Sequence, residues 1–393
     1  MAGPLQGLKI LDFTTLLPGP YATLMLADMG AEVLRVVSGS RLDLTTLLPP
    51  FIGKEPLSAI LAYLGRGKKS LTLNLKDLRA VRIVHQLLDE YDLVIEQFRP
   101  GVMAKFGLDY PALKERRPGL IYCSLTGYGQ TGPMANRAGH DINYLARSGL
   151  MAYSGRKETG PVLTGMQIAD IASGSYNSVI GILAAVVHRQ QTGEGQYIDV
   201  AMTDGAMAFN AMVGAAFLAD GQELEREGHL LNGGSLYDFY ETSDGRYLSF
   251  GGLEPQFFAA FCQAIGRPDW IAGTVVTTDL PKVKKEVREI IGSKTRDEWT
   301  AIFKNFDACL EPVLSLSEAL SDPQAQEREM AVELPIPGGG SVKQLAHPIK
   351  YSETVPEYRH IGVPAGTHTN EVLKKLGYSD QEIAEFEKTG LFS

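Results

Sequence analysis

The sequence predicts an α/β protein, in which helices cover a parallel sheet and a smaller α+β domain follows. Short apolar runs alternate with longer amphipathic stretches over the first two hundred residues, the order that builds such a sheet. A length of 393 residues is enough for two domains. With 44% hydrophobic and 21% charged residues, the composition is that of ordinary globular proteins and argues against disorder.

The apolar runs of the first part are the expected strands. They are residues 8–13, 32–37, 70–75, 93–96, 120–124 and 196–201. Amphipathic stretches between them predict helices at 21–29 and 77–91 and a long helix from about 170 to 191. Strands and helices in this succession predict a doubly wound, Rossmann-like sheet.

The pattern changes near residue 229. We expect short strands at 237–239 and 246–250, joined by a turn at 243–245, and helices at 255–265 and 280–291. The predicted organisation has four parts. They are the N-terminal part of the large domain (1–205), a linker helix (206–228), a small α+β domain (229–330) and a return to the large domain (331–393).

Charge and cysteine content exclude several classes of protein. Lys and Arg number 37 against 46 Asp and Glu, a net charge of −9, which does not suit a nucleic-acid partner. Three cysteines without CxxC spacing support neither a disulfide framework nor a metal site. No secretory signal pattern is seen, and the longest apolar run, 179–187, is far below the ~20 residues of a membrane span. We therefore expect a cytoplasmic protein without a membrane partner.

A glycine-rich motif follows one predicted strand. Residues 127–132 read Gly-Tyr-Gly-Gln-Thr-Gly, a match to the dinucleotide-binding pattern G-x-G-x-x-G. However, Pro133 and the polar pair Asn136-Arg137 stand where an apolar helix should begin, and no acidic residue follows near twenty positions on. We favour a glycine-rich turn beside some other site.

Several carboxylates and one histidine are candidates for chemistry. His140 and Asp141 are adjacent, and adjacent residues do not face each other on a helix, so they form no dyad by themselves. Asp170 interrupts an apolar run at a helix start. It is either a carboxylate that complements the helix dipole or a desolvated nucleophile or base. Glu241 and Glu254 stand near predicted strand ends, where surface charges and helix caps are also common.

Short motifs along almost the whole chain are similar, in order and spacing, to those of one family. They are Leu11-Asp12-Phe13, Leu17-Pro18-Gly19-Pro20, Leu26 to Val33, Arg66 to Ser70, Phe98 to Val102, Gly127 to Gln130, Gly139 to Tyr144, Ala169-Asp170, Thr192-Gly193 with Gly195-Gln196, and Asp307-Ala308-Cys309. On these residues the chain resembles the family III CoA-transferases, which include formyl-CoA transferase, carnitine CoA-transferase and α-methylacyl-CoA racemase. The resemblance implies a large Rossmann-like domain built from both ends of the chain and an obligate, interlocked homodimer. Some members of the family pair with a second, different chain.

The resemblance also implies the ligands. The substrates are an acyl-CoA thioester and a carboxylic acid, and no cofactor is permanently bound. The positions that match CoA contacts of the family are Arg66, Lys68, Lys69, Gln97, Phe98, Arg99 and Lys105. One departure is the segment 36–39, Val-Val-Ser-Gly, where relatives usually have an acidic residue and then a basic residue or proline. Arg35 or Arg41 is expected to substitute for the missing contact.

Two reactions are known within the family, and the resemblance gives Asp170 a role in both. In the transferases, an aspartate at the position of Asp170 attacks the thioester and carries the acyl group and then CoA. In the racemases, residues matching His140 and Asp170 exchange the α-proton from opposite faces. Asp141 and Glu241 complete the expected catalytic group.

The sequence contains features of both reactions. His140-Asp141, Glu241, Glu254, Cys309 and the short Gly233-Gly234 pair resemble the racemases. Met166 and Ile171 replace the asparagine and phenylalanine usual in racemases, and this favours a transferase. We take the transferase as the leading interpretation. Met103, Phe106, Met151, Tyr153 and Tyr237 are expected either to line an apolar acyl pocket or to be ordinary core.

Overall fold

The computed structural model describes residues 3–39, 43–54, 56–271 and 279–392 and divides into two compact units. Unit 1 contains Met1–Ser148, Thr164–Phe209 and Arg328–Ser393, and unit 2 contains Gly149–Leu163 and Asn210–Glu327. The chain thus returns to unit 1 at its C-terminal end. Residues 149–163, which we expected in the large domain, belong to unit 2.

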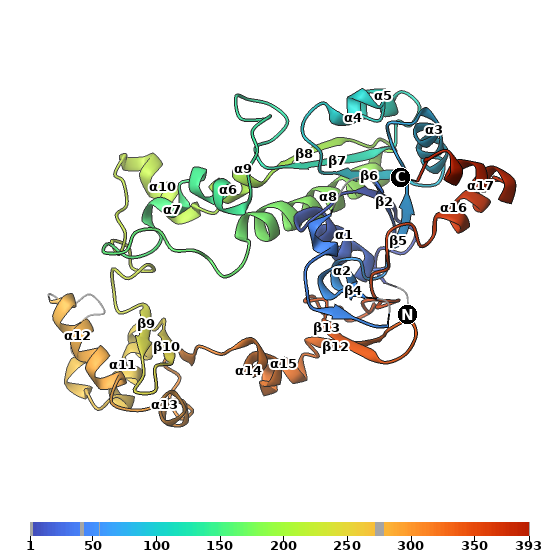
Figure 1. Cartoon of the computed structure of the whole chain (residues 1–393). Helices are drawn as coiled ribbons and strands as arrows, with labels where there is room; N and C mark the ends of the chain where they lie inside the picture. The colour runs from blue at the N-terminus through green and yellow to red at the C-terminus, as the bar shows by residue number, and fades with distance from the viewer. Residues whose placement is uncertain (1–2, 40–42, 55, 272–278, 393) are drawn as a thin grey trace. The chain divides into compact units, whose positions relative to one another are not determined.

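Unit 1 is built around a parallel sheet of six strands (Figure 1). The strands are β1 (Lys9–Phe13), β2 (Glu32–Val37), β5 (Lys69–Thr72), β6 (Leu93–Glu96), β7 (Ile121–Thr126) and β8 (Tyr197–Ala201). Their order across the sheet is β5-β2-β1-β6-β7-β8. The order reverses between β1 and β6, and this confirms the predicted doubly wound sheet, in which ligands bind at such a reversal.

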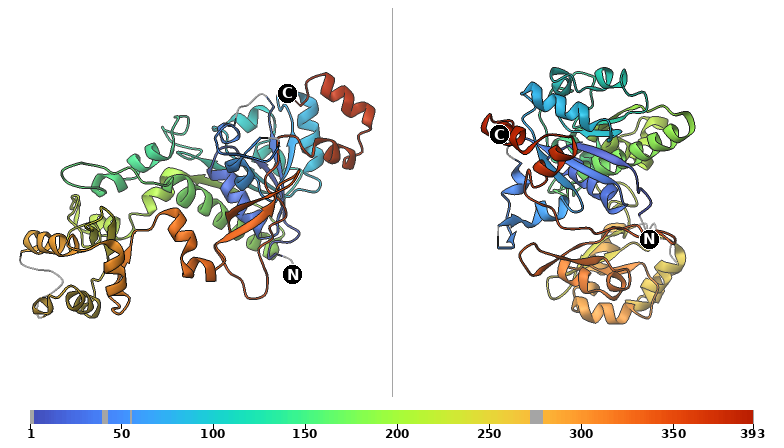
Figure 2. Two further views of the ribbon diagram at one scale, coloured as in Figure 1. Left: turned by 60° about the horizontal axis from the view of Figure 1, so that its bottom comes forward. Right: turned by 90° about the vertical axis from the view of Figure 1, so that its right-hand side faces the viewer.

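The helices of unit 1 pack on this sheet or on one another. They are α1 (Pro18–Asp28), α2 (Ala59–Leu64), α3 (Leu78–Leu87), α4 (Val102–Lys105), α5 (Tyr110–Lys114), α6 (Asp141–Arg147), α8 (Tyr176–Thr192), α9 (Met202–Ala208), α16 (Thr369–Lys375) and α17 (Asp380–Lys388). Smaller elements are the 3-10 helix Leu44–Thr46 and the two-stranded pairs β3 (Phe51–Ile52) with β4 (Leu57–Ser58) and β12 (Ala331–Pro335) with β13 (Ser341–Leu345). Both views of Figure 2 show the C-terminal helices, in red, beside the blue N-terminal elements. The buried core agrees, because Leu373 of α16 packs in one cluster with Leu71, Val84 and Val94.

The long helix predicted after residue 170 has two parts. Ala169–Ser175 is a π-helix, and α8 continues from Tyr176 to Thr192. By length and composition alone, Ala169–Thr192 could cross a membrane, as could the bent pair α9 and α10 (Ala211–Asp220). In the structure α8 packs on β7 and α1, as core helices of globular proteins also do.

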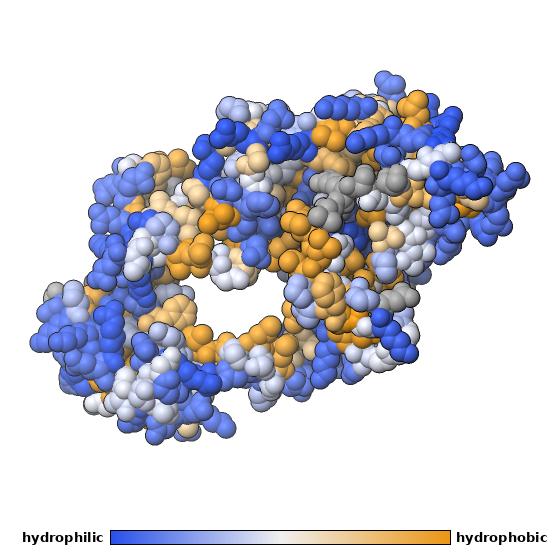
Figure 3. All heavy atoms as spheres, in the orientation of Figure 1, coloured by the Kyte–Doolittle hydropathy of each residue, from blue (hydrophilic) through white to orange (hydrophobic). Residues whose placement is uncertain are grey.

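Unit 2 has an antiparallel sheet with strand order β11-β10-β9. Its strands are β9 (Asp238–Glu241), β10 (Tyr247–Phe250) and β11 (Leu310–Pro312), and its helices are α7 (Leu150–Tyr153), α10, the 3-10 helix Pro268–Trp270, α11 (Pro255–Ala264), α12 (Leu280–Ile291), α13 (Arg296–Phe303), α14 (Leu316–Ser321) and α15 (Pro323–Glu327). The core contains Tyr240, Phe250, Phe261 and Trp299. Figure 3 shows apolar side chains, in orange and tan, in the region of α7 and α10.

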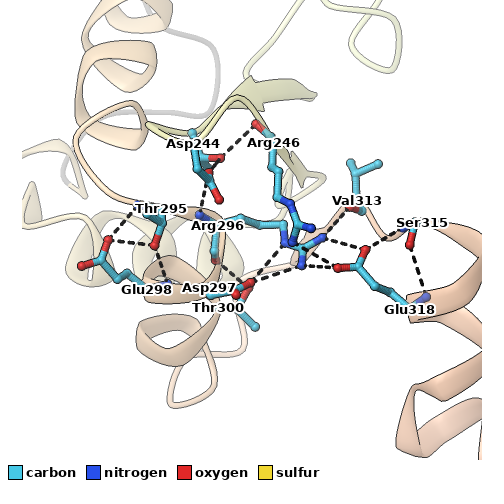
Figure 4. Close-up of polar contacts among 11 residues, drawn as sticks. Asp244, Arg246, Thr295, Arg296, Asp297, Glu298, Thr300, Val313, Ser315 and Glu318 are labelled. Carbon is cyan, nitrogen blue, oxygen red and sulfur yellow. Dashed lines mark hydrogen bonds and ion pairs between the residues drawn. The ribbon is translucent and has the colours of Figure 1, made fainter.

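A polar network holds two helices of unit 2 together (Figure 4). Arg296, at the start of α13, donates from Nη2 to Oε1 of Glu318 on α14 at 2.7 Å and from Nη1 to the Val313 carbonyl at 3.1 Å. Thr295 caps α13, because its Oγ1 accepts a hydrogen bond from the N–H of Glu298. The bidentate arginine fixes the position of α14 relative to α13.

Candidate active site

Asp170 is the second residue of the π-helix, which packs against α1 and α9. Two serines of the π-helix bind these helices: Ser175 Oγ donates to the Pro18 carbonyl, and Ser173 Oγ donates to the Met202 carbonyl, both at 2.6 Å. A Cβ atom at Gly205 would lie only 2.1 Å from Ser173 Oγ, so α9 approaches closely because it has a glycine there. These contacts fix the segment that carries Asp170. Single π-turns within helices are frequent at functional sites.

The environment of Asp170 raises its proton affinity. Burial raises the pKa of the half-buried carboxyl to about 7, and the negative charge of Asp141 contributes in the same direction. The two residues are also linked through the backbone, because the Asp170 N–H donates to Asp141 Oδ1 at 3.0 Å. Both forms of Asp170 are therefore populated near neutral pH, which suits a group that gains and loses a proton or acts as a nucleophile.

His140 precedes α6, the helix that begins with Asp141. Its backbone N–H donates to Asn143 Oδ1 at 3.0 Å, and its side chain is exposed. Tyr144, one turn further along α6, is buried, and its hydroxyl donates to the Gly139 carbonyl at 2.5 Å. Burial and then the charge of Asp170 raise the pKa of this phenol to about 12. The structure thus brings together three of the predicted residues, and it adds Tyr144, which lies in the matched motif but which we did not select.

The glycine-rich motif has a packing role beside this group. A Cβ atom at Gly127 would lie 2.3 Å from the Tyr144 ring, and one at Gly139 would lie 2.6 Å from it. Tyr128 also packs on Tyr144, with its ring edge-on and the centroids 5.2 Å apart. No helix starts among residues 127–139, all of which the structure describes. The motif is therefore a turn beside another site, as we expected, and not a dinucleotide fingerprint.

A cavity of about 520 Å³ lies beyond the carboxyl ends of β1, β2, β5 and β6, where the strand order reverses. Phe98 and Phe106 line it, together with Leu75 and Val36. This is the location at which doubly wound sheets bind nucleotides. Arg35 also lines the cavity, but its guanidinium Nη2 is paired with Asp43 at 2.9 Å. Arg41, the other expected substitute, lies outside the described residues.

The expected contacts of Arg66 and Lys68 with CoA do not match the structure. Both side chains are buried, with 1% of their surface exposed. Arg66 forms two hydrogen bonds to Asp28, at 2.6 and 3.0 Å, and Lys68 Nζ donates to Thr23 Oγ1 and to the Pro20 carbonyl at 2.7 Å. Burial also lowers the pKa of Lys68 to about 8. Their charges are satisfied inside the domain, so neither presents a donor to a ligand.

The remaining predicted contacts differ in exposure. Lys69 pairs with Glu371 at 2.7 Å, and Arg99 and Lys105 are exposed. Gln97 Oε1 accepts a hydrogen bond from the Gly19 N–H at 3.1 Å. This backbone N–H at the start of α1 is therefore already bonded within the protein. Of these positions Phe98 is the one that lines the cavity, and contacts of the others with CoA stay predictions.

Other candidates lie in unit 2. Glu241 is the last residue of β9 and is exposed, as is Glu254 before α11. A cavity of about 900 Å³ in this unit is lined by Tyr237, Cys309 and their neighbours. Met103, which was expected either in an acyl pocket or in the core, is buried in the core cluster of unit 1. The Tyr153 hydroxyl donates to Asn210 Oδ1 at 2.8 Å within unit 2, where Met151 also lies on α7.

Known proteins are similar to this chain over nearly its whole length. The family model described as CoA-transferase family III matches residues 5–369. Alpha-methylacyl-CoA racemase from Homo sapiens is 33% identical, covering 96% of this chain and 95% of its own length. Succinyl-CoA:glutarate CoA-transferase from Homo sapiens is also 33% identical, covering 99% and 90%. Succinate--glutarate CoA-transferase from Agrobacterium fabrum is 35% identical, covering 95% and 96%.

A solved structure supports the same relationship. The CAIB/BAIF family protein from Brucella suis has a TM-score of 0.83 and 30% identity, and the alignment covers 96% of this chain and 100% of that one. The match of the family model, the full-length relatives and the shared architecture agree with the motifs that surround Asp170. The chain belongs to CoA-transferase family III.

Proposed function

We propose that this protein transfers CoA from an acyl-CoA thioester to a carboxylic acid, with Asp170 as the nucleophile. The observation that carries the proposal is the burial of the Asp170 carboxyl without a cationic partner among the described residues. This carboxyl is half-buried and has a pKa of about 7, and no lysine, arginine or histidine forms an ion pair with it among the described residues. Such a carboxylate is more basic and less hydrated than one in water, and both properties favour attack on a thioester.

The reaction conserves the thioester without another energy source. A carboxylate oxygen of Asp170 attacks the thioester carbon, the C–S bond breaks, and CoA leaves as a thiolate. The thiolate then attacks the Asp170 carbonyl of the resulting mixed anhydride, which releases the acyl group as a carboxylate and leaves an aspartyl-CoA thioester. An acceptor carboxylate takes CoA by the same steps in reverse. The relatives that are named as CoA-transferases with succinyl-CoA, succinate or glutarate support a carboxylic acid acceptor.

The second candidate is racemisation at the α-carbon of an acyl-CoA. The specific observation is that His140 directly precedes Asp141, whose carboxylate accepts the backbone N–H of Asp170. An imidazole and a carboxylate held on connected elements could remove and return an α-proton. The chain is 33% identical to human alpha-methylacyl-CoA racemase and 33% identical to human succinyl-CoA:glutarate CoA-transferase. Sequence identity therefore supports racemisation and CoA transfer equally.

One experiment separates the two reactions. The purified protein is incubated in deuterated water with a panel of acyl-CoAs, with and without succinate or acetate, and the products are analysed by mass spectrometry. Transfer predicts new acyl-CoA species that require the added acid and disappear in Asp170→Asn. Racemisation predicts deuterium at the α-carbon without an acceptor, and its loss in both His140→Asn and Asp170→Asn. The exposed Glu194 provides a matched control, since Glu194→Gln should preserve either activity.

A further inference from the structure

The π-helix contains one serine whose contact is specific to the π-turn. Backbone bonds of a π-turn span five residues, whereas those of an α-turn span four. In the regular helix α8, Ser178 Oγ donates at 2.8 Å to the carbonyl of Gly174, four residues back. Ser175 Oγ lies instead 3.1 Å from the carbonyl oxygen of Asp170, five residues back. An α-turn would bring Gly174 over that carbonyl, and glycine has no side chain to donate.

Consecutive residues of the π-turn also contact the neighbouring helices. The Ser175 hydroxyl donates at 2.6 Å to the carbonyl of Pro18, the first residue of α1, so two carbonyls share this hydroxyl. Ser173 Oγ donates at 2.6 Å to the carbonyl of Met202, the first residue of α9. Between the two serines, a Cβ atom at Gly174 would lie 3.0 Å from Met202 Cγ and 3.3 Å from Pro18 Cβ. The turn is therefore bound on both sides.

These contacts favour the π-turn over an α-turn. Successive residues of an α-helix are about 100° apart around its axis. Without the additional residue of the π-turn, the serines and Asp170 would change direction relative to one another by about that angle. Both serines are 0% exposed, so a hydroxyl that lost its acceptor would remain buried at a cost. Because α8 packs on β7 and α1, a change of register would be taken up on the side of Asp170.

We propose that Ser175 and Ser173 are positioning residues for Asp170, whose hydroxyls hold the π-turn and so set the direction of the nucleophilic carboxyl. Their side chains have no exposed surface, so they act through Asp170 and not on a substrate. This inference rests on the function proposed above for the Asp170 carboxyl. The geometry that it predicts is nevertheless measurable without turnover.

Turnover provides the first test. Ser175→Ala should lower kcat for CoA transfer about 10–100-fold, since a displacement of about 1 Å at a reacting group costs about 100-fold. KM for the acyl-CoA should stay within about twofold of the wild-type value, because the serine contacts no substrate. Ser178→Ala is the matched control, because Ser178 is also 0% exposed and bonded to a helix carbonyl. It should lower the melting temperature by a similar amount but keep kcat within about twofold of wild type.

Ionisation of Asp170 provides a second test, which needs no turnover. Asp141 and Tyr144, both of α6, are the titratable groups that interact with Asp170 among the described residues, and neither serine variant changes them. A carboxyl that leaves its half-buried position regains water, so its pKa should fall toward the ordinary value. In NMR titrations of protein labelled with 13C at aspartate carboxyls, Asp170→Asn assigns the signal. The midpoint should be at least about one unit lower in Ser175→Ala than in wild type and Ser178→Ala.

The positioning role and the proposed function fail in different ways. A wild-type chain that transfers no CoA, with an Asp170 midpoint that shifts in Ser175→Ala alone, would remove the proposed function and keep the positioning role. An Asp170 midpoint that is the same in Ser175→Ala and Ser178→Ala would overturn the positioning role, as would equal kcat values of the two variants when the wild type is active. If Ser175→Ala does not fold by circular dichroism, Ser173→Ala undergoes the same tests, because its lost bond is to α9 and not to α1.

Discussion

Burial raises the pKa of Asp170 most, and the charge of Asp141 raises it further, while a hydrogen bond to Asp141 holds the Asp170 backbone in place. The substitution Asp141→Asn removes the charge, while the Asn Oδ1 can still accept the Asp170 N–H. The pKa of Asp170 should then fall, because a nearby negative charge no longer disfavours its ionised form. We expect the midpoint of the single-turnover pH profile to shift to lower pH by about half to one unit. A midpoint equal to that of Glu194→Gln would show that Asp141 has no electrostatic effect.

The same carboxyl should lower the stability of the folded protein at high pH. Its pKa is about 7 in the folded chain and about 3.9 when unfolded, so between these values the folded state holds a proton that the unfolded state has lost. Stability therefore falls as pH rises from 4 to 7. Asp170→Asn abolishes activity but should increase the free energy of unfolding by about 1–2 kcal/mol at pH 8, with no gain at pH 4. Denaturation at the two pH values measures this, and a gain of equal size at both would contradict it.

A local sequence pattern identifies candidate residues, but it does not predict which of them are exposed to a ligand. Asp170 was selected because a carboxylate that interrupts an apolar run stands out in a sequence, and Asp141 was selected because it adjoins His140 in a matched motif. Arg66 and Lys68 were placed at the ligand because they are cationic and lie in a matched motif, whereas the structure buries both against partners distant in sequence. Exposure depends on tertiary packing, and a local motif does not contain that information.

At the scale of elements, the turn before α6 depends on two glycines. Gly127→Ala would place a methyl group 2.3 Å from the Tyr144 ring, so the ring or the turn must move. We expect a loss of about 1–3 kcal/mol in the free energy of unfolding and a larger loss in turnover, since Tyr144 is on the same helix as Asp141. Gly119→Ala is the matched control, because its nearest contact would be an ordinary 3.5 Å. Equal stability of the two variants, measured by chemical denaturation, would refute the steric argument.

The central strands of the parallel sheet were predicted well because each is a mostly buried apolar run. Residues 32–37 and 93–96 have the predicted bounds, and the strand predicted at 120–124 extends to Thr126. The π-helix was not predicted, since its apolar pattern is that of an ordinary helix and its geometry depends on contacts with α1 and α9. The assignment of residues 149–163 to unit 2 was likewise missed, because the division depends on long-range contacts.

At the scale of the whole molecule, a buried ion pair joins distant parts of the chain. Arg66 bonds Asp28 and also donates to Gln344 Oε1 and to the Leu345 carbonyl, at 3.1 and 2.9 Å, in the segment that returns from unit 2. Arg66→Met leaves the Asp28 charge buried without its partner, so we expect a loss of about 3–5 kcal/mol in unfolding experiments. The exposed pair of Lys157 with Glu225 is the control, and Lys157→Met should cost less than about 1 kcal/mol. Similar costs for the two variants would mean that Arg66 does not stabilise the returning segment.

The last prediction concerns self-association, which we infer from the family and from exposed apolar side chains. On α10, Leu218 is 85% exposed and Met212 is 63% exposed, and on α8, Ile180 is 62% exposed. In α10 no residue is buried within this single chain, although its sequence, Ala-Met-Val-Gly-Ala-Ala-Phe-Leu-Ala-Asp, is mostly apolar. Such a helix is unfavourable in water and is typical of a surface that another chain covers.

We therefore expect a homodimer of twice 42.7 kDa, that is 85.4 kDa, in sedimentation velocity, without dissociation on dilution. The double variant Met212→Asp with Leu218→Asp should sediment as a monomer or fail to fold, because two charges would be buried at the interface. The control is Leu78→Asp, which adds an aspartate in unit 1, where Leu78 is 78% exposed at the start of α3. A wild-type monomer at micromolar concentration, or a double variant that sediments at 85.4 kDa, would show that α10 is not an interface.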